Sequence, residues 1–532
     1  MRITNQMLTT NMLNNINRNK TNVNKTGYQY STQQKIEKPS DDPVVAVRSL
    51  KYRTQITELT QYLEKNIPDA TNWMDTTEGA MSSINTVLEK MYNYCNQGST
   101  DTLETENRNS IIETLKEYKE QIYSDANADY AGRYLFTGFR TDTPLLYDKT
   151  SLQKQEANHT IYTITEELSF SDITNKTYVK GGASYTANTP ADTYASKAAS
   201  TASASCLQLS YTNLDSAATT TDTVGGKTFT RNTGISSITF TNPTNAADTI
   251  TVDTTGTSGY TLTTKSLTAG VQGDCYSPTA KEIIFIPETG ELIFGSDAYA
   301  MAQQKSDFNV TYTKSTFEEG DIKPEHYFAC TTSTIEMDAA SGSYAEKNIN
   351  YQNPSSQKIE YEVNFSQKLT VNTLAKDAVS TTIGTKVDEI VRAVNNVYEM
   401  EDKLSEVKKL ISTTTNETEL ANLKELQKQL ETEQTLKKSI LREAFSSGMT
   451  MTQKAQDTVN IALADHGSRA NRLELTKDRL QDQKTSFTKL LDDNDQVELE
   501  ESVINYKQAQ VVYDASLSCA STIISKSLLD YL

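Results

Sequence analysis

An apolar stripe with helical spacing, between residues 56 and 95, constrains the fold of this chain more than any other feature. Its members step forward by three or four residues throughout, and all except Thr77 are apolar: Ile56, Leu59, Leu63, Ile67, Ala70, Met74, Thr77, Met81, Ile84, Leu88, Met91 and Cys95. Such a stripe is the seam of a coiled coil. We therefore predict one helix from Pro43 to about Tyr94, roughly 75 Å long at the usual helical rise. Pro68 predicts a kink or local break within it.

Other stretches share this helical spacing. A second helix is indicated between Ile111 and Ala126, and the pattern resumes near Val387. The last segment is predicted as an amphipathic helix that runs to Leu532, with these seam positions: Val503, Tyr506, Tyr513, Leu517, Ala520, Ile524 and Tyr531. Residues 1–30 carry only a thin apolar stripe, which is too narrow to support a helix standing alone in water.

The middle of the chain, from about residue 149 to 385, has a different character. Thr, Ser, Ala and Gly dominate there, and apolar residues alternate with polar ones, as around Phe308 and Val363. The segment 282–294 contains two apolar runs around a Pro/Gly turn and predicts a β-hairpin. We expect one β-rich domain, or two small ones, inserted into a helical body.

The order of these patterns predicts the fold class. Both ends of the chain carry helices that bury only one stripe, and the simplest solution packs the ends against each other. We predict an α+β multidomain protein: a long antiparallel helical bundle or coiled coil built from both termini, with an inserted β-rich outer domain. The predicted domains are a terminal helical domain (1–42 with 490–532), a helical rod (43–148 with 386–489) and the inserted surface domain (149–385).

The two extreme ends have too little apolar surface to pack firmly. We expect the terminal domain to be mobile in the monomer and to become ordered when neighbouring subunits supply the missing surface. The alternative is an antiparallel hairpin that is complete within the monomer.

Charge and composition argue against several classes of partner. The net charge of −18 argues against a nucleic-acid groove and against an anionic membrane surface. No apolar run is long enough for a membrane span, and the amino terminus has no apolar core of the kind found in cleaved signal peptides. If the protein leaves the cytoplasm, we expect a route without a cleaved signal.

The residues that usually carry chemistry are few and scattered. Five cysteines lie far apart without a CxxC pair, and only three histidines occur, in different regions. We therefore predict no catalytic residues, no metal site and no cofactor, and hence no enzyme. His466 precedes a glycine and is expected to help restart a helix. Asp41 and Asp42 are expected to form a turn, and either of them could cap a helix whose first turn contains Pro43.

Motifs at both ends of the chain resemble those of the flagellin superfamily, and within it the proteins that join hook to filament. The amino-terminal motifs are Met1-Arg-Ile-Thr-Asn-Gln-Met, the turn Pro39-Ser40-Asp41-Asp42-Pro43, and the Tyr-Leu-Phe-Thr-Gly segment that ends at Gly138. The carboxyl-terminal motifs are Gly467-Ser-Arg-Ala-Asn-Arg-Leu-Glu474 and Ser527-Leu-Leu-Asp-Tyr-Leu532. A filament flagellin would show a different turn and a different end. The motifs lie in roughly the first 148 and the last 145 residues, and the middle resembles no family.

The resemblance implies a structural role in the bacterial flagellum. A protein of this kind would form a ring layer of identical subunits between hook-associated protein 1 and the filament flagellin, outside the cell. It would be exported through the flagellar type III channel without a cleaved signal, and an export chaperone would cover its carboxyl-terminal helix beforehand. Nucleic acid and membrane are not among the expected partners.

Two alternative functions stay open at this point. One is a filament flagellin, which has the same architecture but a different place in the flagellum. The other is a secreted adhesin or translocator with coiled-coil ends and a β head, against which the motifs at both termini speak.

The candidate assembly and chaperone surface consists of the apolar stripes at the two ends of the chain. Its predicted members are Ile3, Met7, Met12, Ile16, Leu517, Ile524, Leu528 and Leu532. An exposed apolar stripe is an aggregation hazard until a partner covers it. The alternative is that these side chains pack only within the subunit.

Overall fold

The computed structural model describes residues 5–100, 105–182, 185, 199–267, 274–338 and 342–524. The chain folds into two compact units. Unit 1 comprises residues 1–71, 361–369 and 470–532, and unit 2 comprises residues 72–360 and 370–469. Each unit is described by itself below. The predicted three-domain division is not tested by these two units and stays a prediction.

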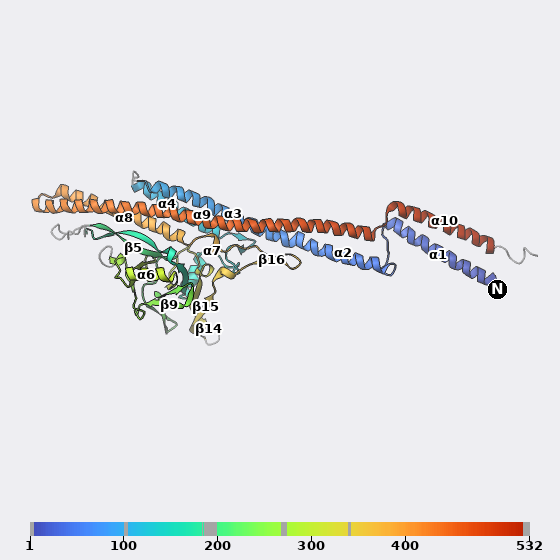
Figure 1. Ribbon diagram of the computed structural model, residues 1–532, viewed down its shortest axis with the longest axis horizontal. Coiled ribbons are helices and arrows are strands. Elements are labelled where there is room, and N and C mark those ends of the chain that lie inside the picture. The colour runs from blue at the N-terminus through green and yellow to red at the C-terminus, as the bar shows by residue number, and fades with distance from the viewer. Residues whose placement is uncertain are drawn as a thin grey trace, which may run out of the picture. The chain divides into compact units, whose positions relative to one another are not determined.

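Unit 1 is built mainly from helices of both chain ends (Figure 1). Its helices are α1 (Asn5–Thr32), α2 (Pro43–Gln61), the last part of α9 (Glu417–Asp495) and α10 (Leu499–Ile524). Helices α1 and α10 pack against each other, and the segments that connect them to α2 and α9 form an antiparallel bridge between Gln34 and Gln496. The predicted pairing of the two chain ends is therefore present.

The long amino-terminal helix stays helical from Pro43 to Gly98, but its hydrogen-bond pattern changes between residues 62 and 66. A π-helical turn, Tyr62–Asn66, joins α2 to α3 (Ile67–Gly98), and the N–H of Ile67 donates to the carbonyl of Tyr62. The proline ring at position 68 cannot sit in regular α-helical register, because it would meet the carbonyl four residues earlier and it lacks an N–H. The predicted local break at Pro68 is thus a π turn directly before it.

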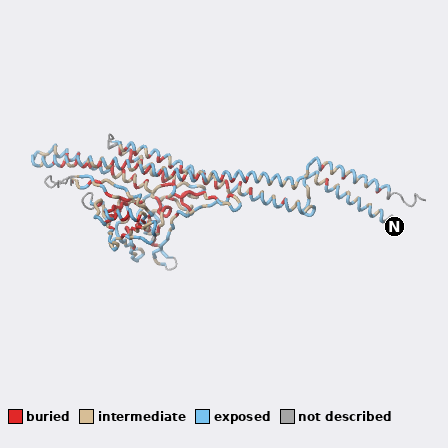
Figure 2. Tube along the Cα trace, in the orientation of Figure 1, coloured by how far each residue is buried: buried red, intermediate tan, exposed pale blue. Residues whose placement is uncertain are grey.

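Unit 2 contains the main helical core. Its helices are the rest of α3, α4 (Thr105–Ala126), α8 (Thr382–Thr413) and the first part of α9. Buried residues recur along the helices of unit 2 (Figure 2). The large side chains of Met81, Ile84 and Leu88 in the α3 stripe are almost completely buried. Close approaches join three of these helices, since Gly98 of α3 lies against Phe445 of α9 and Gly448 of α9 lies against Ile390 of α8.

The β-rich part of unit 2 consists of two larger sheets and smaller hairpins. The six-stranded sheet is antiparallel, in the order β15 (Ser343–Tyr351), β14 (Ala329–Asp338), β3 (Ile161–Ser169), β13 (Asp307–Lys314), β8 (Ile235–Asn242) and β9 (Asn245–Asp253). The five-stranded sheet has the order β10 (Thr261–Thr264), β11 (Glu282–Ile286), β12 (Glu291–Phe294), β5 (Ser200–Gln208) and β4 (Thr174–Lys180), with only β10 and β11 parallel.

Short elements complete the fold. The two-stranded sheets are β1 (Asp129–Tyr130) with β2 (Arg133–Tyr134), β6 (Thr219–Val224) with β7 (Lys227–Asn232), and β16 (Glu360–Asn364) with β17 (Gln367–Thr370). The short helices are α5 (Lys149–Ala157), α6 (Ser296–Lys305) and α7 (Ala375–Ala378).

The central strands β11 and β12 of the five-stranded sheet are buried on both faces, which explains the continuous apolar run of β11. Ile283 and Phe285 belong to the core that includes residues of the six-stranded sheet and α6, whereas Ile284 and Ile286 join a second apolar cluster with Tyr178 of β4. The predicted hairpin over 282–294 is confirmed as β11 and β12, with Gly290 at φ +68° in the turn. The predicted α+β class, with helical ends and a β-rich middle, is confirmed as well.

Candidate functional site

Small and polar residues form the buried seam between α1 and α10. The buried side chains described in this helix pair are Thr26, Ser502, Ala509 and Ala520. The hydroxyls of Thr26 and Ser502 donate to backbone carbonyls of their own helices, so neither needs a partner across the seam. Small side chains let two helices approach closely but bury little apolar area. Larger apolar residues such as Met12, Ile16 and Val503 are only half-buried in this pair, so it gains less hydrophobic stabilisation than a fully packed core.

An aromatic contact adds to this seam. The rings of Tyr30 and Tyr506 stack with their centroids 5.7 Å apart and their planes 6° from parallel. Gly27 makes room for this arrangement, since a Cβ at that position would lie 3.3 Å from the Tyr506 ring. The stack lies near the ends of α1 and α10 that the Gln34–Gln496 bridge joins.

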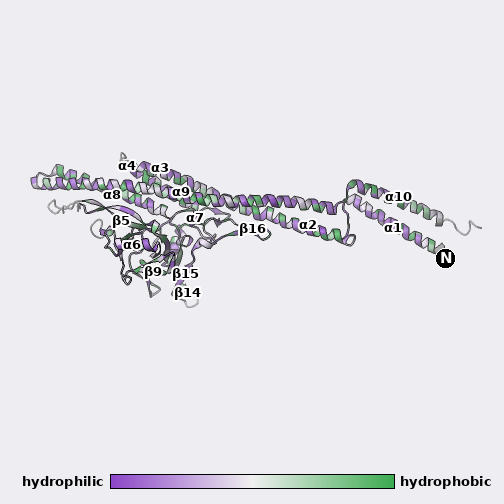
Figure 3. Cartoon of the chain, in the orientation of Figure 1, coloured by the Kyte–Doolittle hydropathy of each residue, from purple (hydrophilic) through white to green (hydrophobic). Residues whose placement is uncertain are grey.

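Several large apolar side chains of the same helix pair are exposed. Val511 is 66% exposed, Ile504 64% and Met7 58%, and the other exposed apolar residues of α1 and α10 are Leu8, Leu13, Leu499, Val512 and Leu517. Hydrophobic residues are distributed along α10, whereas α1 is mainly hydrophilic (Figure 3). Apolar side chains repeated along an exposed helix are typical of a surface that another protein covers.

The predicted assembly residues divide into three groups. Met7 and Leu517 are exposed, and Met12 and Ile16 are half-buried within the α1–α10 pair. The side chains of Ile3, Ile524, Leu528 and Leu532 lie outside the described residues. Ile504 and Val511 were not among the predicted residues, although both are apolar positions of α10 that lie off the predicted seam. The assembly role of all these residues stays a prediction.

The turn at residues 39–43 has a definite geometry. The carboxylate of Asp42 accepts hydrogen bonds from the N–H groups of Val44 (3.0 Å) and Val45 (3.2 Å), so Asp42 is the N-cap of α2. The carboxylate of Asp41 instead accepts from the N–H groups of Glu37 (3.1 Å) and Lys38 (3.0 Å) and closes the preceding loop. Pro43 occupies the first turn of α2, where its missing N–H costs nothing.

Asp495, at the end of α9, connects this region to the start of α2. Its carboxylate accepts hydrogen bonds from the Ser49 hydroxyl (2.8 Å) and the Arg53 guanidinium (2.9 Å), and its carbonyl accepts from the N–H of Lys35 (2.8 Å). Partial burial acts to raise the pKa of Asp495, but the hydrogen bonds from Ser49 and Arg53 outweigh it and hold this pKa below its usual range. The charged form of Asp495 thus fixes α2 to α9 within unit 1.

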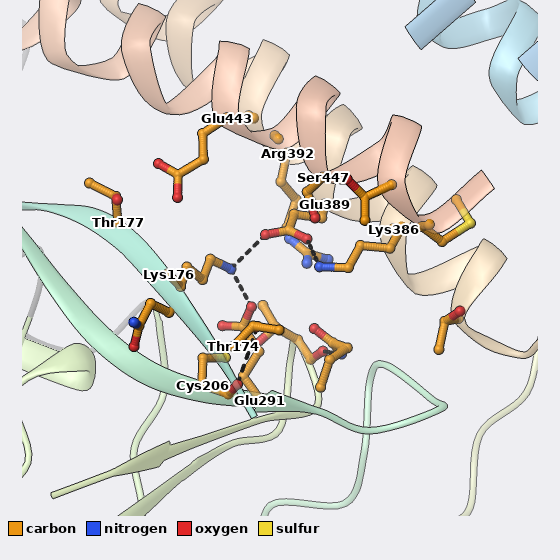
Figure 4. Close-up of a pocket in the computed structure, with 18 of the residues that line it drawn as sticks. Thr174, Lys176, Thr177, Cys206, Glu291, Lys386, Glu389, Arg392, Glu443 and Ser447 are labelled. Atoms are coloured by element: carbon orange, nitrogen blue, oxygen red, sulfur yellow. Dashed lines mark hydrogen bonds and ion pairs between the residues drawn. The ribbon is translucent and has the colours of Figure 1, made fainter. Parts of the chain in front are cut away.

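A cluster of paired charges lies in unit 2, between β4 and α8 (Figure 4). The Lys176 ammonium contacts the carboxylates of Glu291 and Glu389, at 3.1 Å for Glu389, and Lys386 contacts Glu389 at 2.7 Å. Burial opposes the ionisation of Glu389, but the two lysines outweigh it and lower its pKa to about 2. These charges pair with one another, so the cluster fixes β4 to α8 and is unsuited to proton transfer near neutral pH.

The three histidines do not form a site. His326 is buried, and burial together with Arg140 and Lys323 lowers its pKa to about 3. The side chain of His466 is buried, and its Nε2 lies 2.9 Å from the carbonyl oxygen of Met74. The expectation that His466 helps restart a helix was wrong, because α9 continues through Gly467. His159 lies 3.0 Å from Asp222 at the surface.

Within the described ranges, no group of three or more His, Cys, Asp or Glu side chains is arranged to hold a metal ion. The described helices also include none with an apolar run long enough to cross a bilayer. Cys519 is exposed and the other four cysteines are buried as free thiols, and burial raises the pKa of Cys95 to about 12. These buried thiols are therefore protonated and unreactive.

Comparisons with known proteins identify similarity to flagellar proteins, with a family match in the amino-terminal region. Residues 3–141 match the family model of the bacterial flagellin N-terminal helical region. The flagellar hook-associated protein 3 of Salmonella typhimurium is 28% identical over 144 residues, which are 27% of this chain and 45% of that protein. The protein of the same name from Escherichia coli K12 is 28% identical over 145 residues, again 27% and 45%. A flagellin of Clostridium tyrobutyricum is 30% identical over 127 residues, 24% of this chain and 33% of that protein.

The match thus spans less than half of the length of these hook-associated relatives. Among solved structures, a putative flagellar hook-associated protein from Vibrio parahaemolyticus aligns with 86% of this chain and all of its own, at 11% identity and a TM-score of 0.34. The family model confirms the resemblance to the flagellin superfamily for residues 3–141, and the sequence matches confirm the resemblance to hook-associated protein 3 over about a quarter of the chain.

Proposed function

Because this chain carries the amino-terminal helical region of the flagellin family, we propose that it is a structural component of the bacterial flagellum, in the layer that joins the hook to the filament. The observation that carries the proposal is the exposed apolar surface of α1 and α10 beside a seam of small residues. Such helices reach full burial only when copies or neighbours in an assembly cover their outer faces.

In this role the subunits form a ring with copies of themselves, between hook-associated protein 1 on one side and filament flagellin on the other. The protein is exported through the flagellar type III channel without a cleaved signal and is located outside the cell. Before export, a chaperone covers the carboxyl-terminal helix. The exposed side chains of Val511 and Leu517 on α10 support this step, because they offer such a chaperone an apolar surface.

The function is structural and not enzymatic in this proposal. The ion cluster around Lys176 is internally paired, and the buried His326 and Cys95 are held in neutral forms. The three predicted domains correspond to an inner assembly domain, a rod and an outer surface domain.

Deletion of the gene tests the proposed position in the flagellum. Cells without a junction protein should keep intact hooks and release unassembled flagellin into the medium. Complementation with Leu517→Asp should fail to restore filaments, because a carboxylate on the exposed face of α10 opposes burial in the assembly. Met337→Asp, at an exposed apolar position at the end of β14, is the matched control and should restore them. Filaments that form with Leu517→Asp would exclude this face as an assembly surface.

A filament flagellin is the second candidate function, and the 30% identity to the Clostridium tyrobutyricum flagellin over 127 residues favours it. Abundance separates the two candidates. A filament subunit is made in large excess over a junction subunit, and its deletion leaves hooks without any flagellin in the medium. Quantitative mass spectrometry of sheared flagella therefore decides between them.

A further inference from the structure

A groove of about 750 Å³ lies within unit 2, between the five-stranded sheet and helices α8 and α9 (Figure 4). On the sheet side it is lined by residues of β4 and β5, among them Lys176, Tyr178 and Cys206. On the helix side it is lined by Arg392 of α8 and by several residues of α9. Sites for small molecules usually have volumes of about 300–1,000 Å³ and combine apolar walls with a few polar groups. The size and lining of the groove fit such a site.

Arg392 in this groove has a buried nitrogen without an acceptor. Its Nη2 atom makes no hydrogen bond to any residue that the structure describes. The neighbouring cations differ, since Lys386 contacts Glu389 and Lys437 contacts Glu433 at 3.3 Å. Buried polar groups are nearly always hydrogen-bonded, and an unpaired one is destabilising. The Arg392 guanidinium is therefore arranged to receive an acceptor from outside the chain.

The walls of the groove are partly apolar. Ala444, Met451 and Ala455 line the groove from α9, and Leu267 and Tyr276 line it from the β-rich side. A ligand that fills this space thus needs an apolar body in addition to its acceptor group.

The charge of the lining restricts the acceptor further. Basic and acidic side chains are equal in number: Lys176, Lys386, Arg392, Lys437 and Lys454 against Glu166, Asp172, Glu291, Glu389 and Glu443. A dianionic phosphate would meet repulsion from several carboxylates, while most of the buried cations already have carboxylate partners. A single carboxylate matches the planar fork of one guanidinium.

We propose that this groove binds a small organic monocarboxylate, with the carboxylate on the Arg392 guanidinium and an apolar body against α9. The proposal does not depend on the place of the protein in the flagellum, because all of its residues belong to unit 2. Arg392 is a binding residue in this site, and Ser447, which is drawn beside it in Figure 4, marks the wall opposite the sheet.

Binding of hexanoate to the full chain tests the proposal. In a saturation-transfer NMR titration we expect saturable binding with a Kd on the order of 1 mM, as suits so small a probe. Hexanamide has the same shape without the charge, and hexyl phosphate carries the larger charge, so both should bind about tenfold more weakly or worse. Arg392→Gln should weaken hexanoate binding about tenfold, because it removes the charged fork.

Two further variants keep this test decisive. Ser447→Trp should abolish binding because the indole fills the groove, and Lys438→Gln, a cation of α9 outside the lining, should leave Kd unchanged. Far-UV circular dichroism reports whether each variant stays folded, and the fluorescence of Trp73, the sole tryptophan of the wild type, reports the same for Arg392→Gln and Lys438→Gln. The proposal is overturned if the wild-type chain shows no saturable binding, if folded Arg392→Gln binds equally well, or if hexanamide competes as strongly as hexanoate.

Discussion

The terminal helix pair α1–α10 and the helices of unit 2 are both built from helix-periodic sequence, but only unit 2 buries large apolar side chains completely. In unit 2, large residues such as Leu88 and Met81 are 0% exposed. In the terminal pair, the small residues Ala509 and Ala520 are buried while Val511 is 66% exposed. The apolar stripes are therefore covered by other parts of the chain in unit 2, whereas the terminal pair leaves large apolar residues exposed.

This difference suggests that unit 2 supplies most of the folding stability and that the terminal pair serves association with other proteins. Burial of large apolar side chains supplies most of the folding free energy, so unit 2 is expected to fold without partners. The terminal pair gains little from its seam and retains apolar surface for other proteins. Substitutions in unit 2 should then act on folding, and substitutions on the outer face of α10 should act on association.

The largest expected effect comes from the unit 2 core. Leu88→Ala removes a fully buried side chain from α3 and should lower the free energy of unfolding by about 3–4 kcal/mol, through lost burial and a residual cavity. Urea unfolding followed by Trp73 fluorescence measures this value. A loss below about 1 kcal/mol would show that this core is loosely packed. Unit 2 would then not differ from the terminal pair in the stability that its buried side chains supply.

The next largest effect is a pH dependence of the unfolding free energy, which we expect in unit 2 and not in the terminal pair. Burial raises the pKa of Glu166 to about 7, although hydrogen bonds from Tyr312 and Ser210 act in the opposite direction. An acid whose folded pKa exceeds its unfolded value binds more protons when folded, so stability is highest below the unfolded value and falls as pH rises through the folded one. Unit 2 should lose on the order of 2–3 kcal/mol between about pH 5 and pH 8.

The matched variant for this pH test is Glu166→Gln, which cannot ionise. Its unfolding free energy, measured by Trp73 fluorescence in urea, should vary much less over the same pH interval. In the terminal pair, the buried side chains described are uncharged, so its helicity should not follow this titration. An unchanged pH dependence in Glu166→Gln would assign the effect to another group.

A smaller effect is expected at the turn that leads from the terminal pair into α2. Asp42→Ala removes the N-cap of α2 and should cost about 1 kcal/mol. Hydrogen exchange of the Val44 and Val45 amides, the two donors to Asp42, reports the loss directly. Asp42→Asn keeps a capping oxygen and should behave as the wild type. Equal exchange in Asp42→Ala would mean that Pro43 alone starts the helix.

The smallest effect is expected on the exposed face of α10. Leu517→Ala is the same change as Leu88→Ala, but at an exposed position of α10, and should alter thermal stability by no more than about 0.5 kcal/mol. Thermal unfolding followed by circular dichroism measures it. A loss that approaches that of Leu88→Ala would show that this face is buried within the free subunit, and the proposed assembly surface would have to be abandoned.

Sequence spacing predicted the long helices and the hairpin over 282–294, because regular periodicity arises from local geometry. It failed where a single residue type was given too much weight. Gly467 suggested a helix restart at His466, but one glycine costs a helix only about 1 kcal/mol, and α9 continues. Both Leu517 and Ala520 belong to the predicted stripe of α10, but only Ala520 is buried. Which stripe residues become buried depends on how α1 packs against α10, and the sequence of α10 alone does not determine this.

The groove was missed because it joins residues far apart in the chain. Lys176, Glu291 and Arg392 come from β4, β12 and α8, and no motif connects them. Neither charge nor hydropathy patterns reveal which of several cations will lack an acceptor, because that depends on the packing of the sheet against the helices.

The π turn at Tyr62–Asn66 also corrects the phase of the helix. Leu59, Leu63 and Ile67 are spaced four apart, and in a regular α-helix each such step would carry the side chain about 40° further around the axis. The wider turn winds this rotation back, so that all three remain buried. Regular α-helical winding of the same residues would turn Leu59 about 80° away from the direction of Ile67. Deleting one residue here would restore ordinary winding and leave the two faces aligned, because seven residues make almost two full turns. An apparent irregularity thus keeps the buried side of the helix facing one direction on both sides of the proline.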